Sequence, residues 1–145
     1  MNKMQEINYY SIKVREEDKP KLFDIVSKYF NIPDDWKRYA DHMTVLHHSH
    51  KDFKTVSPYL YQMYGHELPI FINGIGISDN TVALMCSNMS CNKHSHITIA
   101  VAPGHKPVES NDIKDNEIIW FDTVIPIFGI FTVHVLGYCK DKNLY

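Results

Sequence analysis

Apolar residues follow two different rhythms in the first half of the chain. Runs rich in β-branched and aromatic residues, such as INYYSIKV, predict strands, and apolar side chains at three- and four-residue spacing predict helices. Pro33 interrupts the first helical pattern, and Gly65 follows the second. The predicted order is strand, helix, strand, helix, over residues 7–14, 16–30, 42–48 and 52–64.

The pattern becomes wholly β-like after Gly65. Apolar runs are separated by Gly, Asn, Asp and Pro, and they predict strands over residues 67–77, 81–86, 95–102, 117–125 and 127–138. Residues 103–116 show no periodicity and are expected to form a long loop, a frequent place for ligand binding. Because no repeat or linker divides the chain, residues 1–145 are predicted to form one α+β domain.

Composition narrows the choice of partners. The chain has a net charge of −2 and an isoelectric point near 6.5, which argues against binding of a long nucleic-acid duplex and leaves a small phosphorylated ligand open. No apolar run is long enough to suggest a membrane or signal segment. The three cysteines, Cys86, Cys91 and Cys139, are odd in number, so we expect a soluble protein of the cytoplasm.

Nine histidines are unusually many for this length, and two of them share a sequence context. His42 and His96 each lie in a predicted strand and precede a threonine by two positions, in His42-Met43-Thr44 and His96-Ile97-Thr98. Side chains alternate along a strand, so each histidine shares a face with its threonine. The intervening segment is long enough to let the two strands meet across one cleft.

These four side chains suit the cleavage of a phosphodiester. A neutral imidazole can take a proton from the attacking group while a protonated one supplies a proton to the leaving oxygen. Threonine hydroxyls can donate hydrogen bonds to the phosphate oxygens as charge builds up. We therefore predict a site that needs neither metal nor cofactor, with His42, Thr44, His96 and Thr98 as its catalytic residues.

Other residues are candidates for substrate binding. Aromatic side chains at the cleft could stack on a base, and polar ones in the long loop could hold a phosphate or ribose. Packing in the core or solvation of a loop would explain the same residues. The candidates are Tyr9, Tyr10, Trp36, Tyr145, Lys106, Ser110 and Asn111.

A zinc site is the rival interpretation of the histidines and cysteines. The ligand types are suitable, but their spacing follows no usual zinc pattern. A zinc-stabilised interaction module is therefore the weaker prediction. It would draw on His47, His48 and His50, or on Cys86, Cys91, His94 and His96.

The paired motifs resemble the 2H phosphoesterase superfamily, whose signature is two H-x-T/S-x motifs with apolar x. Residues 96–111, which run into Lys106-Pro107-Val108-Glu109-Ser110-Asn111, are similar to the branch that contains small phage anti-CBASS nucleases and the cyclic phosphodiesterase domain of fungal tRNA ligases. The resemblance implies a bilobal, LigT-like α+β fold. Two antiparallel sheets would line a central cleft, with the helices outside.

The resemblance also implies a substrate with a ribose 2′ oxygen near the scissile phosphate. Our first expectation is a viral enzyme of immune evasion, acting in the infected host cytoplasm, that hydrolyses 3′,5′-linked cyclic oligonucleotide signals such as cGAMP. The alternative is a 2′,3′-cyclic phosphodiesterase acting on RNA ends or cyclic mononucleotides. A further alternative is a sponge that binds a cyclic nucleotide without cleaving it.

Overall fold

The computed structural model describes residues 6–135 of the chain. Its strands and helices agree with most of the predicted elements. The strands are β1 Ile7–Val14, β2 Lys37–Arg38, β3 His42–His47, β4 Glu67–Ile77, β5 Thr81–Cys86, β6 Ser95–Val101 and β7 Ile118–Val135. The helices are α1 Lys19–Ser27 and α2 Phe53–Tyr61, with shorter 3-10 turns at η2 Glu16–Asp18, η3 Pro107–Asp112 and η4 Asp115–Glu117.

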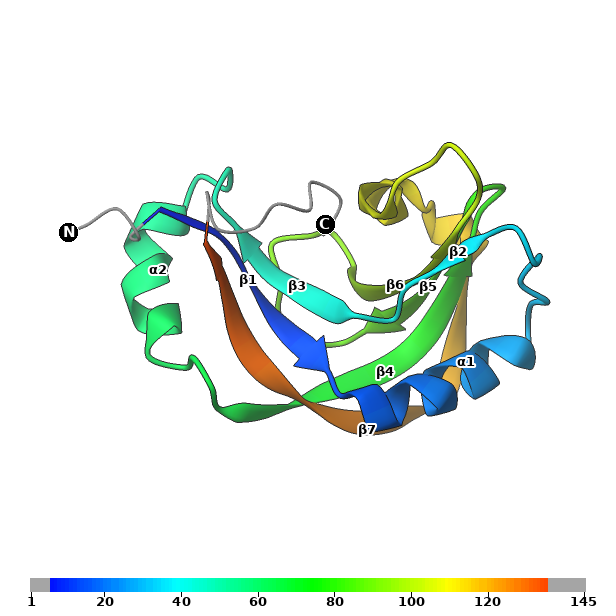
Figure 1. Ribbon diagram of the computed structural model, residues 1–145, viewed down its shortest axis with the longest axis horizontal. Coiled ribbons are helices and arrows are strands. Elements are labelled where there is room, and N and C mark those ends of the chain that lie inside the picture. The colour runs from blue at the N-terminus through cyan, green and yellow to red at the C-terminus, as the bar shows by residue number, and fades with distance from the viewer. Residues whose placement is uncertain (1–5, 136–145) are drawn as a thin grey trace.

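All described strands belong to one antiparallel sheet of order β2-β6-β3-β1-β7-β4-β5, and a further pairing of β5 with β6 closes it on itself. The sheet curls so that β3 and β6 approach each other, with α1 and α2 on its outer side (Figure 1). The predicted α+β class is confirmed. The expected division into two separate sheets is not, because the strands pair continuously around the ring.

β7 replaces the two strands predicted over residues 117–125 and 127–138. Pro126 suggested a break, yet it pairs with Phe71 of β4 within the continuous strand. Pairing with β1 on the other side begins only at Gly129, so at Pro126 the strand is paired on one side. Proline is tolerated at such edge positions because a missing N–H need not break a ladder there.

A bulge in β3 changes which side chains face the inside. Tyr10 pairs with Leu46 and Ser11 with Thr44, which leaves Val45 as an extra residue in β3. Strict alternation would put Leu46 on the same face as His42 and Thr44. The bulge instead turns Leu46 towards the core and brings the next residue, His47, to the inner face opposite Tyr9.

The two helices cover the outer face of the sheet. α1 begins with Pro20 in its first turn, where a missing N–H is harmless, and it buries Leu22, Ile25 and Val26. α2 lies over β1, where the Phe53 ring packs 6.0 Å from that of Tyr10. Over the described residues, neither helix is long and apolar enough to cross a membrane.

Gly129 lies where β7 passes between β1 and β4, and it gives a direct test of this packing. A Cβ atom there would overlap the carbonyl oxygen of Lys13 and lie 2.7 Å from Ile12 Cγ2. We expect Gly129→Ala to lower the free energy of unfolding by about 1–3 kcal/mol in urea titrations. Val124→Ala, at a half-exposed position of the same strand, is the control and should change it by less than about 0.5 kcal/mol. Equal effects would contradict this packing.

Candidate active site

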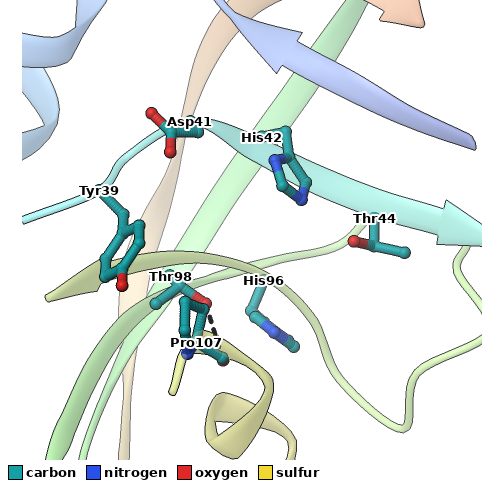
Figure 2. Close-up of a pocket in the computed structure, with 7 residues that line it drawn as sticks. All are labelled: Tyr39, Asp41, His42, Thr44, His96, Thr98 and Pro107. Atoms are coloured by element: carbon teal, nitrogen blue, oxygen red, sulfur yellow. Dashed lines mark hydrogen bonds between the residues drawn. The ribbon is translucent and has the colours of Figure 1, made fainter. Parts of the chain in front are cut away.

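The two His-x-Thr motifs lie on neighbouring strands. β3 and β6 pair antiparallel at Met43 and Ile97, the middle residue of each motif. In an antiparallel pair this register sets the histidine of one motif opposite the threonine of the other. Figure 2 shows the four side chains on the same side of the two strands. The predicted meeting of the two strands is therefore confirmed.

A pocket lies over this pairing and holds an empty volume of about 310 Å³, including its open mouth. Both histidines and both threonines line it, so one bound phosphate could reach all four side chains. The remaining lining residues come from the segment before β3 and from the start of η3. The full lining is Tyr39, Asp41, His42, Thr44, His96, Thr98 and Pro107 (Figure 2).

His96 is buried and held in a defined orientation. Its Nδ1 lies 2.9 Å from the carbonyl oxygen of His94 and must carry the proton to donate this hydrogen bond. Nε2 is therefore the basic nitrogen of the neutral ring. Burial lowers the pKa of His96, although the bond to His94 opposes the shift. His96 is thus neutral at pH 7 and able to accept a proton.

The surroundings of His42 on balance disfavour its charged form. Burial, followed by the nearby His134, lowers its pKa to about 4, while Asp41 acts in the opposite direction. The rings of His42 and His134 are 5.9 Å apart between centroids. Without a ligand, His42 is therefore neutral at pH 7 as well. A bound phosphate would favour its protonated form, because an opposite charge raises the pKa of a histidine.

His134 of β7 is a further histidine on the inner face, close to His42, and the motifs gave no indication of its place there. Its ring stacks on Tyr9 with centroids 4.1 Å apart, and its Nε2 lies 3.1 Å from Ser11 Oγ. Burial, then Lys13, lowers its pKa to about 4. Only the pairing of β7 with β1 brings it close to His42, a contact between residues remote in sequence.

A serine from outside the sheet bonds to each motif threonine, Ser110 of η3 to Thr98 and Ser90 to Thr44. The Thr98 hydroxyl lies 2.7 Å from Ser110 Oγ and 3.3 Å from the Pro107 carbonyl oxygen. When Ser110 donates its hydrogen to Thr98 Oγ1, the Thr98 hydroxyl donates to the Pro107 carbonyl oxygen. This longer bond can be replaced by a hydrogen bond from Thr98 to a phosphate oxygen. In β3, Ser90 donates to the Thr44 carbonyl oxygen at 2.8 Å, which fixes the backbone of the first motif.

Tyr39, which no sequence motif singled out, lines the pocket three residues before His42. Its backbone N–H bonds to the Ile99 carbonyl, and the next residue, Ala40, has a left-handed φ of 62°. The Lys37 ammonium lies 5.1 Å from the centre of the Tyr39 ring. An aromatic residue just before a motif strand was the available signal, but the same signal pointed to Trp36.

The structure places three predicted stacking residues away from the open pocket. Tyr10 is fully buried under α2, where its hydroxyl bonds to Ser57, so its ring does not line the pocket over the motifs. Tyr9 does face the inner side, but it is also fully buried, and it packs against His42 and His134 instead of offering a free ring. Trp36 packs on Phe30, with ring centroids 5.5 Å apart.

The predicted loop contacts occupy different environments. Ser110 is buried and bonds to Thr98 rather than standing open to a ligand. Lys106 and Asn111 are exposed and do not line the pocket over the motifs. Asn111 borders a smaller neighbouring pocket. Tyr145, the remaining candidate, lies outside the described residues.

The residues proposed for zinc do not assemble. Between residues 6 and 135, no group of three or more His, Cys, Asp or Glu side chains is placed to hold a metal ion. Cys86 is buried with its thiol pKa raised by desolvation, and His94 pairs with Asp115. The zinc-module interpretation therefore has no structural support in this part of the chain.

This chain shares its fold with a protein of known structure. No protein-family model matches the chain, and no curated protein matches its sequence. Among solved structures, a fungal protein described as an RNA kinase superposes on 93% of this chain with a TM-score of 0.64 and 17% identity. The aligned part is only 46% of that protein's length. At this identity the comparison shows the fold alone.

The lowered histidine pKa values predict a specific pH dependence of stability. The unfolded chain binds protons on its histidines below about pH 6.5, whereas folded His42 and His134 resist protonation until about pH 4. Their contribution to stability is therefore present above that window and is lost as the pH falls through it. In urea unfolding at pH 7 and pH 4.5, wild type should lose more stability than His134→Gln. Equal losses in both proteins would refute the assignment for His134.

Proposed function

We propose that this protein is a metal-independent phosphodiesterase that uses two histidines as acid and base. The observation that carries the proposal is one pocket lined by His42, Thr44, His96 and Thr98. The pairing of Met43 with Ile97 holds both motifs in one register, so the geometry does not depend on a flexible loop. Binding alone would not require two proton-transfer groups, which argues against a nucleotide sponge.

His96 is assigned as the general base. Its Nδ1–H is committed to the His94 carbonyl, so Nε2 is free to accept a proton. A water, or a hydroxyl of the substrate, attacks phosphorus and gives its proton to this nitrogen. The bond between phosphorus and the leaving oxygen then breaks, and His96 ends the step positively charged.

His42 is assigned as the general acid. It must be protonated before the step, and the negative phosphodiester supplies the charge that favours this form in the pocket. His42 gives its proton to the leaving ribose oxygen and ends the step neutral. Exchange of one proton with solvent at each ring then restores the starting state. Each proton transfer contributes about 10²–10⁴ to the rate.

The threonines are assigned to the non-bridging phosphate oxygens. No hydrogen bond of the Thr44 hydroxyl is found among residues 6–135, and the Thr98 hydroxyl can exchange its 3.3 Å contact with Pro107 for a ligand. Hydroxyl donors held at fixed positions stabilise charge that develops in the transition state.

A 2′,3′-cyclic phosphate at an RNA end is the substrate we favour. Its leaving oxygen is a ribose hydroxyl, so acid–base catalysis is sufficient to open the ring. The solved structure with the same fold is described as an RNA kinase, which supports RNA ends as the substrate class. Cyclic oligonucleotide signals, the first expectation from the sequence, have no support from the comparisons. Hydrolysis of cyclic oligonucleotides stays a prediction, and the same assay tests it.

The test is turnover of adenosine 2′,3′-cyclic phosphate, an RNA oligomer with a 2′,3′-cyclic end and cyclic dinucleotides, all in the presence of EDTA. We expect hydrolysis of the first two by wild type, and kcat lower by about 10²–10⁴ in His42→Ala and in His96→Ala. His66→Ala is the matched control, because His66 is exposed and does not line the pocket. It should retain wild-type turnover.

Two results would contradict the proposal. Undiminished turnover in both motif variants would place the active site elsewhere. Complete loss of wild-type turnover on chelation would exclude the metal-independent mechanism. Exclusive cleavage of the cyclic dinucleotides would keep the chemistry and overturn our choice of substrate.

A further inference from the structure

We propose that Trp120 and His94 form a nucleobase-binding subsite beside the His96 end of the pocket. This inference rests on the proposed function, since it assigns a binding place to the base of a nucleotide whose phosphate lies between the two motifs. Trp120 was not among the residues singled out from the sequence.

The sheet register puts Trp120 on the same face as His96. His96 pairs with Met85 of β5, Met85 pairs with Gly74 of β4, and Gly74 pairs with Trp120 of β7. Residues that are directly opposite in a sheet share a face. This row of residues therefore runs from His96, the proposed general base, across three strand spacings to Trp120. At about 4.8 Å per spacing, the two backbones are roughly 14 Å apart, and the intervening side chains partly cover that distance.

Gly74 allows the indole to lie over the sheet. A Cβ atom on Gly74 would be 2.8 Å from Trp120 Cε3, so any larger residue would push the ring away. The ring thus rests on the glycine, yet Trp120 remains 51% exposed. A half-exposed indole held in one place offers a flat apolar surface, and such surfaces bind bases with little dependence on sequence.

His94 connects this surface to the proposed catalytic site. Its ring meets that of Trp120 edge-on, with centroids 5.7 Å apart and an interplanar angle of 63°. Its Nε2 lies 2.8 Å from Asp115 Oδ1, and its carbonyl oxygen is the acceptor that orients His96. Asp115 also pairs with the exposed Lys93 at 3.4 Å, so an ammonium and a carboxylate lie together beside His94.

A second, smaller pocket is lined by His94 and by residues of η3. It is bordered by Ser110, the residue that bonds to Thr98, so it adjoins the pocket over the motifs. Asn111, predicted from the sequence as a substrate contact, is found here. The lining residues are Met85, Lys93, His94, Ser110, Asn111 and Ile113.

The first test compares the binding of adenosine 2′-phosphate with that of inorganic phosphate by calorimetry. Loss of one base stack should raise the Kd of Trp120→Ala for the nucleotide by about 5- to 150-fold and leave its Kd for phosphate unchanged. Trp36→Phe is the matched control, since Trp36 packs on Phe30, and it should bind both ligands as wild type does. An unchanged nucleotide Kd in Trp120→Ala, or equal weakening for both ligands, would overturn the subsite.

A second measurement avoids any change at Trp120. In Trp36→Phe, Trp120 is the only tryptophan left of the two in the chain, so its fluorescence reports the subsite directly. Adenosine 2′-phosphate should quench it, and inorganic phosphate should not. Fluorescence that does not change at saturating nucleotide would also overturn the subsite.

The two proposals can fail separately. Trp120-dependent nucleotide binding without turnover of any cyclic phosphate would support the subsite and contradict the phosphodiesterase. Turnover with wild-type kcat and KM in Trp120→Ala would support the phosphodiesterase and contradict the subsite.

Discussion

The antiparallel pairing of Met43 with Ile97 is the contact on which the candidate site depends. It joins β3 and β6 and thereby helps to close the curled sheet, whose other joint is the pairing of β5 with β6. Both residues are fully buried, so the apolar core fixes the register of the strands. Because His and Thr flank the pair on each strand, the same burial that stabilises the fold sets the four polar side chains around one pocket.

Closing the sheet also determines the charge state of the site. The inner face is poor in solvent, so His42, His96 and His134 all have lowered pKa values and are neutral in the free protein. Acid–base catalysis needs one of the two motif histidines in its protonated, charged form and the other in its neutral form. In this account the anionic substrate supplies the electrostatic stabilisation for that proton, which links protonation of His42 to the binding of a phosphodiester.

Local patterns were sufficient to predict much of this architecture. The bounds of β1, β4 and β5 agree with the predicted strands, and the facing of each motif histidine with its threonine follows from alternation alone. The predictions were wrong where tertiary contacts determine which face a side chain occupies or how far a strand extends. The extra residue Val45 reverses the alternation of inward- and outward-facing side chains in β3. Pairing with β4 keeps β7 continuous across Pro126. The sequence also cannot show that α2 covers Tyr10, or that β7 brings His134 to His42.

The central claim is that His42 and His96 act as one unit on the same phosphate. A double-variant cycle tests it most directly, with kcat/KM for adenosine 2′,3′-cyclic phosphate measured in His42→Ala, His96→Ala and the double variant. Residues that act as a unit show strongly non-additive effects. We predict that the double variant is hardly slower than either single variant. Losses that multiply would show two independent roles and would contradict the account.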